Sequence, residues 1–174
     1  MSINSAYEAA TLYYQQGLKG NEVTKISAET LKMAKIAGLD AADATDKMTA
    51  ALRGFNMEID EASAQRVSDV YSQLAAITAA DTKEIANAMT KTASIAHSAG
   101  MEFETTAAFL AQIVETTRES AETAGTAMKT VIARFQELKK SPDEIGEVEG
   151  EIVDANAIEA ALRTVGVSLR DTNG

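Results

Sequence analysis

The chain has 174 residues, of which 45% are hydrophobic, with a net charge of −10 and no cysteine. This length can bury one modest core or two small ones, and the missing cysteines exclude disulfide bonds and thiol catalysis. The acidic balance disfavours binding to nucleic acid and to anionic membranes, because both require surplus lysine and arginine. A single proline leaves long segments free to form helices.

Apolar residues recur at the helical period through most of the chain and predict an all-α array of about seven short helices. In chain order, the helices are indicated by residues 5–16, by a segment from Ser27 to Ala37, and by the sets Ala44/Met48/Ala51/Leu52, Val67/Val70/Tyr71/Leu74/Thr78, Ile85/Ala88/Met89/Thr92, Ala107/Leu110/Ala111/Val114 and Ala124/Ala127/Met128/Val131/Phe135/Leu138. The third helix is expected to end at Gly54. The spacing of Asp81 and Glu84 is that of a capping box, which begins a helix before Ile85.

A nine-residue pattern occurs three times, at residues 38–46, 56–64 and 100–108. Each copy begins with glycine or asparagine, the residues that most readily adopt positive φ, and continues with an apolar and then an acidic residue. This order is expected where one helix ends in a left-handed residue and the next begins with acid near its positive end. The pattern therefore predicts tight corners between packed helices, an arrangement more typical of a scaffold than of an enzyme.

The character of the sequence changes near Lys140. A Ser-Pro-Asp sequence at 141–143 breaks helices, and residues 143–154 carry six carboxylates. We expect a helical core module over residues 1–139, an acidic linker or loop over 140–156, and a small C-terminal helix with a strand-like turn over 157–174. The helical set of that last segment is Ile158/Ala161/Leu162/Val165. It ends in Asn-Gly, a favoured hairpin turn, so we expect the sequence to continue in a longer protein.

No residue set predicts catalysis or ligand binding. His97 is the only histidine, so no second one can share a metal with it, and it is interpreted as structural or solvated. The carboxylate pairs Glu115/Glu119 and Glu119/Glu122 are interpreted as a solvated helix face beside Arg118. The three aspartates Asp40, Asp43 and Asp46 are interpreted as charges at a helix N-terminus, because the glycine and the glutamate of a calcium-binding loop are missing. The expected catalytic, cofactor-binding and metal-binding sets are therefore all empty.

Gly125 lies inside the longest apolar set, where glycine costs about 1 kcal/mol relative to alanine. A helix that passes close by would explain it, and the favoured partners are residues 62–78 or 104–115 of the same chain, with a second copy as the alternative. The methionines recur at apolar and corner positions. They are interpreted as adaptable core residues, with a methionine-lined binding groove as the alternative.

Several segments occur in an order shared with a known family. They are YYQQGL at 13–18, AGLDAADATD at 37–46 leading into MTAAL at 48–52, FNM at 55–57, EA at 61–62, SAETAGTAM at 120–128 and VGVSLRDTNG at 165–174. Because these segments occur in the family's order, the chain resembles the core region of phage tail tape measure proteins over residues 7–174. The most specific segment is 120–128, in which an Ala-Gly-Thr-Ala core precedes a basic, apolar helix.

The resemblance implies a structural component of a bacteriophage or prophage tail, and no enzyme. A protein of this family sets tail length, occupies the tail lumen of the virion and leaves it at genome ejection, and it is made in the host cytoplasm. The implied partners are tail tube proteins, distal tail or baseplate proteins and tail assembly chaperones, with self-association as a further option. No small-molecule substrate, stable nucleic-acid binding or membrane-spanning segment is expected.

A measuring rod needs long uninterrupted helices, at about 1.5 Å per residue. Short helices with many corners instead predict a compact module at one end of such a protein, or an assembly handle. The main alternative is a bacterial signalling or chaperone-binding helical module, which a long heptad repeat would support. A pore-forming helical protein is a further alternative, and a carboxylate enzyme with two Glu-x-x-His motifs is excluded by the single histidine.

Overall fold

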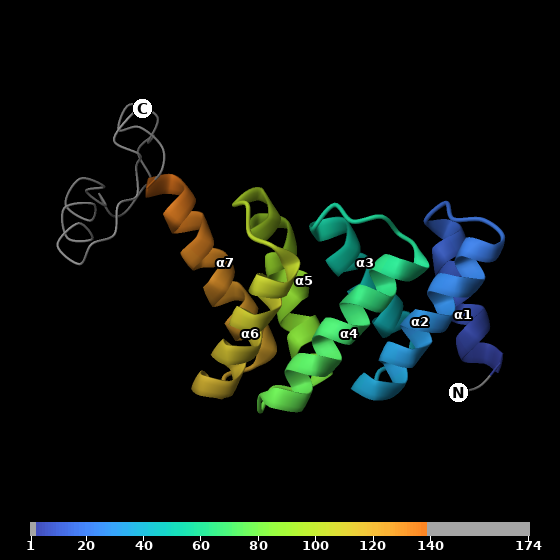
Figure 1. The fold of residues 1–174 in the computed structure, drawn as a ribbon, viewed down its shortest axis with the longest axis horizontal. Coiled ribbons are helices and arrows are strands. Elements are labelled where there is room, and N and C mark those ends of the chain that lie inside the picture. Colours follow the sequence, from blue (N-terminus) through green and yellow to red (C-terminus); the bar gives the residue numbers. More distant parts are fainter. Residues whose placement is uncertain (1–2, 139–174) are drawn as a thin grey trace. The chain divides into compact units, whose positions relative to one another are not determined.

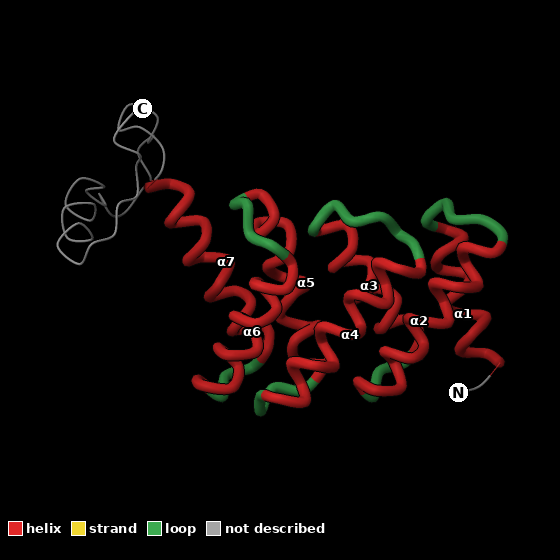
Figure 2. The backbone as a smooth tube through the Cα atoms, viewed as in Figure 1, coloured by secondary structure: helices red, strands yellow, loops and turns green. Residues whose placement is uncertain are grey.

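The structure, a computed structural model, describes residues 3–138, which form seven α-helices and no β-strand within that range (Figures 1 and 2). The helices are α1 (Ile3–Gln15), α2 (Asn21–Ala37), α3 (Ala41–Gly54), α4 (Glu61–Ile77), α5 (Thr82–Ser98), α6 (Phe103–Thr117) and α7 (Ala121–Leu138). The predicted all-α fold and the number of helices are confirmed for this range. The expected linker, C-terminal helix and strand-like turn lie outside the described residues.

The chain divides into two units, Met1–Lys129 and Thr130–Gly174. Helices α1 to α6 and the first half of α7 belong to the first unit, and the packing described below is that of this unit. The limits expected from the sequence, 1–139, 140–156 and 157–174, stay a prediction because residues 139–174 are outside the described range.

Four connections between helices use the same backbone corner. The first or second residue after each of these helices has a positive φ, which is 95° at Gly17, 65° at Gly38, 53° at Asn56 and 79° at Gly100. In each corner the next amide N–H donates to the carbonyl five residues earlier, with N–O distances of 3.2 Å for Leu18, 2.9 Å for Leu39, 2.8 Å for Met57 and 3.0 Å for Met101. These bonds satisfy carbonyls that the helix end leaves free. The three predicted corners are confirmed, and Gly17 adds a fourth.

Aspartates cap the N-termini of α3, α4 and α5. Their carboxylates accept backbone N–H groups three residues later, at 2.7 Å for Asp40 and Asp43, 2.8 Å for Asp60 and Ser63, and 2.7 Å for Asp81 and Glu84. The backbone N–H of Asp81 also donates to Glu84 Oε2 at 2.9 Å, which confirms the predicted capping box. The helix start expected at Ser27 is wrong, because α2 begins at Asn21 and Ser27 is buried inside it.

The helices of the first unit pack as a stack of antiparallel hairpins, α1–α2, α3–α4 and α5–α6 (Figure 1). The odd-numbered helices contact one another in order, α1 with α3 and α3 with α5, and the even-numbered helices do the same, α2 with α4 and α4 with α6. All extensive contacts join helices one to three places apart in the chain. Helical repeat proteins have this organisation, in which each unit buries its apolar face against its neighbours.

Burial repeats with a period of about 40 residues. In the odd-numbered row, the buried sets are Ala41/Ala44/Thr45/Met48/Ala51/Leu52 on α3 and Thr82/Ile85/Ala86/Met89/Thr92/Ala93 on α5. In the even-numbered row, they are Val23/Ile26/Ser27/Thr30 on α2, Ala64/Val67/Ser68/Tyr71 on α4 and Ala107/Leu110/Ala111/Val114 on α6. Each set has the same internal spacing as the others in its row, so residues can be compared position by position between hairpins.

The apolar face predicted for α7 is only partly confirmed, because Ala124 and Met128 are buried as expected but the rest of the face is displaced. Val131 and Phe135 are 52% and 46% exposed, and Ala127 is exposed as well, whereas Gly125 and the set Ala121/Ala124/Met128 are buried. The buried set repeats that of α5, with Gly125 in the place of a buried alanine. Glycine carries no hydrophobic side chain, so Gly125 was not counted in the apolar pattern. The predicted face was therefore displaced by about one residue from the face that is buried.

Candidate interaction surfaces of the helix stack

Two glycines bring neighbouring helices against α5 without an intervening side chain. A Cβ atom at Gly54 of α3 would lie 2.4 Å from Ala93 Cβ, and one at Gly125 of α7 would lie 2.5 Å from the carbonyl oxygen of Ala88. Both distances are far shorter than any real contact of a Cβ atom. The helices can therefore approach this closely only because both positions are glycine.

The close approach expected at Gly125 is confirmed, but the partner helix was predicted wrongly. The backbone at Gly125 lies against α5, and not against the expected segments 62–78 or 104–115. Thr92 Oγ1 of α5 also donates a hydrogen bond to the Gly125 carbonyl at 2.9 Å. The partner could not be identified from sequence because alanine-rich faces occur on several helices.

Ion pairs join successive helices of the even-numbered row. Lys25 Nζ of α2 lies 3.0 Å from Glu61 Oε2 of α4. Arg66 of α4 binds Glu104 of α6 with two parallel hydrogen bonds, of 2.6 Å from Nε and 2.9 Å from Nη2. The hydrogen bond from Arg66 lowers the pKa of Glu104. All four side chains are about half exposed, so each pair contributes roughly 0–1 kcal/mol to stability.

Aromatic and hydroxyl groups occupy the interior of the stack. Phe103 packs edge-on against Phe55 with ring centres 5.5 Å apart, and against Tyr71 at 5.7 Å. Tyr13 and Thr30 share a buried hydrogen bond of 2.6 Å, and burial raises the pKa of Tyr13 to about 12. Burial also raises the pKa of Tyr71. These tyrosines are therefore neutral core residues at any ordinary pH.

The residues considered for chemistry each have a local structural role. His97 is exposed and touches the edge of the Phe55 ring, with centres 6.0 Å apart. Asp40 caps a helix, Asp43 pairs with Lys47, and Glu115 accepts the Ala79 amide N–H at 3.3 Å. Within residues 3–138, no group of three acidic or histidine side chains could hold a metal ion.

The methionines of the described residues serve mainly as core residues. Met33, Met48, Met89 and Met128 are almost fully buried, and Met57 and Met101 are half-buried behind their corners. A methionine-lined groove is thus not formed by these side chains. In the described part of the chain, no helix is both long and apolar enough to cross a membrane.

Repeated hairpins, backbone contacts at glycine and ion pairs between repeats define a helical repeat scaffold. The chain belongs to the phage-related minor tail protein family, whose model matches residues 1–174. It is 29% identical over 158 residues to the tape measure protein of Pneumococcus phage Dp-1. The match covers 91% of this chain but 12% of that relative. No solved structure matches the chain.

Family membership places the chain among structural proteins of phage tails and confirms the resemblance found in the sequence. It favours that class over a bacterial signalling or chaperone-binding module. The buried α7 set, Ala121/Ala124/Gly125/Met128, falls in the segment that carries the most specific resemblance. The residues that resemble the family most closely are therefore those that pack α7 into the scaffold.

Proposed function

We propose that this chain is a compact assembly module of a tail tape measure protein, and not its measuring rod. The observation that supports this is the stack of short helices joined by fixed corners. The longest described helix has 18 residues and spans about 27 Å, too little to act as a continuous ruler. The complete protein would occupy the tail lumen, set tail length during assembly and leave the tube at genome ejection.

The charge of the chain supports a place in the lumen. A net charge of −10 gives it little affinity for DNA, which must pass through the same channel. The proposed role requires protein contacts and no catalysis. Its partners would be tail tube proteins, distal tail or baseplate proteins, and the tail assembly chaperones that hold the protein in the host cytoplasm before assembly.

The proposed role can be tested in the phage that encodes the chain. Gly54→Leu and Gly125→Leu insert side chains where α5 leaves no room, and should disrupt the module. Ala127→Leu, at an exposed position of α7, is the matched control. Electron microscopy would count assembled tails and measure their lengths. We expect the glycine variants to assemble fewer tails, while the tails that do form keep the normal length.

Two results would contradict this role. Tails of altered but uniform length would mean that the segment contributes to the ruler, and normal numbers of normal tails would mean that assembly does not need the module. The place in the lumen has its own test, by mass spectrometry of purified particles. Peptides from residues 3–138 should be present in intact virions and depleted after ejection, and their full retention in emptied particles would refute a role inside the channel.

A further inference from the structure

An apolar stripe runs along the exposed side of α1. Ile3, Tyr7 and Tyr14 are 89%, 77% and 55% exposed. Together with the partly buried Ala10 they have the spacing i, i+4, i+7 and i+11, which is that of the contact positions of a coiled coil. The four side chains therefore follow one line along the helix. α1 packs against α2 and α3, and neither helix covers the three large side chains.

The stripe differs in chemistry from the other helices of the odd-numbered row. The buried pair of α1 repeats about 40 residues later on α3 and again on α5, as Ala9/Tyr13, Met48/Leu52 and Met89/Ala93. In this match the positions of the stripe are occupied by Ala42, Asp46, Thr49 and Arg53 on α3, and by Lys83, Asn87, Thr90 and Ser94 on α5. None of these eight residues is buried, and seven of them are polar. Exposure at these positions is thus normal for the row, whereas a line of large apolar side chains is particular to α1.

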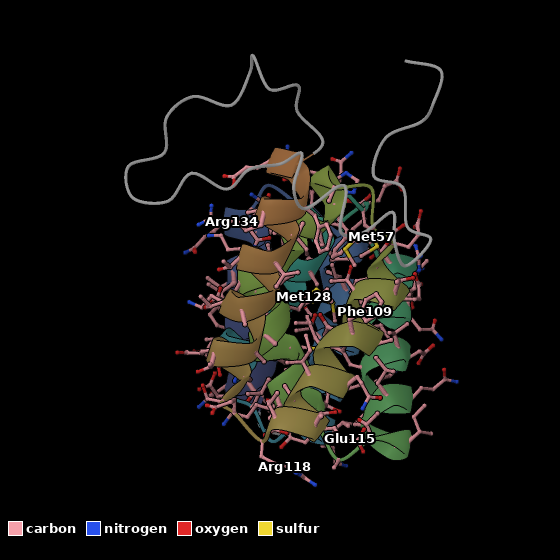
Figure 3. All side chains as sticks on the ribbon, turned by 90° about the vertical axis from the view of Figure 1, so that its left-hand side faces the viewer. Met57, Phe109, Glu115, Arg118, Met128 and Arg134 are labelled. Carbon is pink, nitrogen blue, oxygen red and sulfur yellow. The ribbon has the colours of Figure 1, made fainter. Side chains whose placement is uncertain are left out.

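No other described helix exposes as many large apolar side chains. Of the exposed large hydrophobic residues, three lie on α1 and at most two on any other helix of residues 3–138. Phe109 of α6, on the side turned toward the viewer in Figure 3, is 53% exposed, but it has polar neighbours along its helix. They are Thr105, Gln112 and Thr116. A single exposed ring is ordinary on a protein surface, and a contiguous stripe is not.

The stripe is large enough for a specific protein contact. A tyrosine side chain that becomes fully buried removes about 150–250 Å² from water, so the three large side chains offer roughly 400–500 Å². Two such surfaces that face each other would bury roughly 800–1,000 Å², which is near the lower limit for a specific interface. A pair of equal stripes should therefore form a weak and reversible contact.

The charge distribution also favours α1 as a contact between copies. Each chain carries a net charge of −10, so two copies repel one another. α1 has Glu8 as its only charged residue, and Glu8 is not part of the stripe. Every other described helix carries at least two charged residues. Two copies therefore approach each other with the least electrostatic repulsion through α1.

We propose that α1 pairs with α1 of a second copy in antiparallel orientation, about a two-fold axis between residues 8 and 9. Ile3 then faces the partner's Tyr14, and Tyr7 faces the partner's Ala10, so each tyrosine meets a smaller side chain. A parallel pair would instead place tyrosine on tyrosine and alanine on alanine, which leaves layers of uneven width. The two-fold contact uses the same surface of both copies and is closed at two.

Sedimentation of the full chain over about 10–500 µM tests the pairing, and we expect a reversible dimer in this range. Tyr14→Glu should raise the dissociation constant at least about tenfold. The matched control is Phe109→Glu, which adds the same charge at an equally exposed aromatic position and should change the constant less than about twofold. A parent chain that stays monomeric, equal effects of the two variants, or growth beyond a dimer would each overturn the proposal.

Salt distinguishes an apolar contact from an ionic one. Higher ionic strength screens the repulsion between two chains of net charge −10, so the dimer should become stronger. A dimer that weakens in salt would be held by ion pairs, and this result would overturn pairing through the stripe. The self-association is measured on the purified chain, so it can fail while the proposed tail role holds, and the reverse is equally possible.

The absence of natural cysteines allows the orientation to be tested. Asn4 and Thr11 lie beside the stripe, about 10 Å apart along the helix, and the antiparallel pair brings residue 4 of one copy near residue 11 of the other. Full chains carrying Asn4→Cys and Thr11→Cys are mixed and treated with a short thiol crosslinker. We expect the mixed product to exceed either same-site product at least about fivefold, against about twofold for random pairing. A smaller ratio would overturn the antiparallel orientation.

Discussion

Thr92 and Gly125 join α5 to α7 through a hydrogen bond that depends on a missing side chain. Thr92 Oγ1 donates to the Gly125 carbonyl at 2.9 Å, and a Cβ atom on Gly125 would lie 2.5 Å from the carbonyl oxygen of Ala88. The obstructing atoms belong to the backbone of α5, which cannot move aside as the end of a flexible side chain can. The contact is therefore specific to glycine.

Gly125→Leu should destabilise the protein by about 1–3 kcal/mol, although leucine is the better helix former by roughly 1 kcal/mol. The cause is overpacking against Ala88, and urea unfolding would measure it. The control Ala127→Leu, at an exposed position on the same helix, should change stability by less than about 0.5 kcal/mol. A more stable Gly125→Leu variant would show that α7 does not lie against α5.

The contact between Gly54 and Ala93 predicts that a second substitution restores stability lost by the first. Gly54→Ala alone should destabilise by about 1–3 kcal/mol, because its Cβ would lie 2.4 Å from Ala93 Cβ. Adding Ala93→Gly removes that atom, at a helix cost of about 1 kcal/mol. A double-mutant cycle should then give a favourable coupling of about 1 kcal/mol or more. Simple additivity of the two changes would contradict the contact.

Substitution of Gly100 should lower the stability of the protein through backbone strain alone. Its φ is 79°, and no atom lies within 4 Å of the position that a Cβ atom would take there, so crowding plays no part. Gly100→Val should cost more than about 1 kcal/mol, since β-branched residues strongly disfavour this conformation. Ala99→Val, at an ordinary helical φ of −83°, is the control. Equal melting temperatures for the two variants would contradict the positive φ of Gly100.

The pairing of Arg66 with Glu104 predicts a pH effect of known sign. The pKa of Glu104 is lowered in the folded protein from 4.5, so its contribution to stability is present above that pH and is lost as the pH falls through the lower folded value. Arg66→Gln should cost under about 1 kcal/mol at pH 7, because the pair is half exposed. The difference from the parent should shrink on acidification, and a difference that grows below pH 4.5 would contradict this account.

Local features of the fold could be predicted from the sequence. The corners at Gly38, Asn56 and Gly100 and the capping box at Asp81 depend on a few adjacent residues whose backbone chemistry is specific. The number of helices follows from the same signals. The all-α class was confirmed because it rests on the helical period of the apolar residues, and the family resemblance because it rests on short segments in a fixed order.

Long-range features could not be predicted in this way. The repeat of about 40 residues was missed because the nine-residue pattern mixes corners within hairpins, at Asn56 and Gly100, with one between hairpins, at Gly38. The partner of Gly125 was wrong because small residues leave little chemical signal of what they contact. The ion pairs of Lys25 and Arg66 join residues far apart in sequence, and only their equivalence within the repeat could have indicated them.

The order of contacts in the stack also determines how it can come apart. Every extensive contact joins helices at most three places apart in the chain. No described helix therefore contacts helices at both ends of the first unit. Loss of the outermost hairpin would therefore break only that hairpin's contacts with its neighbours, namely its buried apolar face and any glycine contacts and ion pairs it makes. Unfolding that starts at one end of the first unit can thus proceed hairpin by hairpin, without first breaking contacts between distant helices.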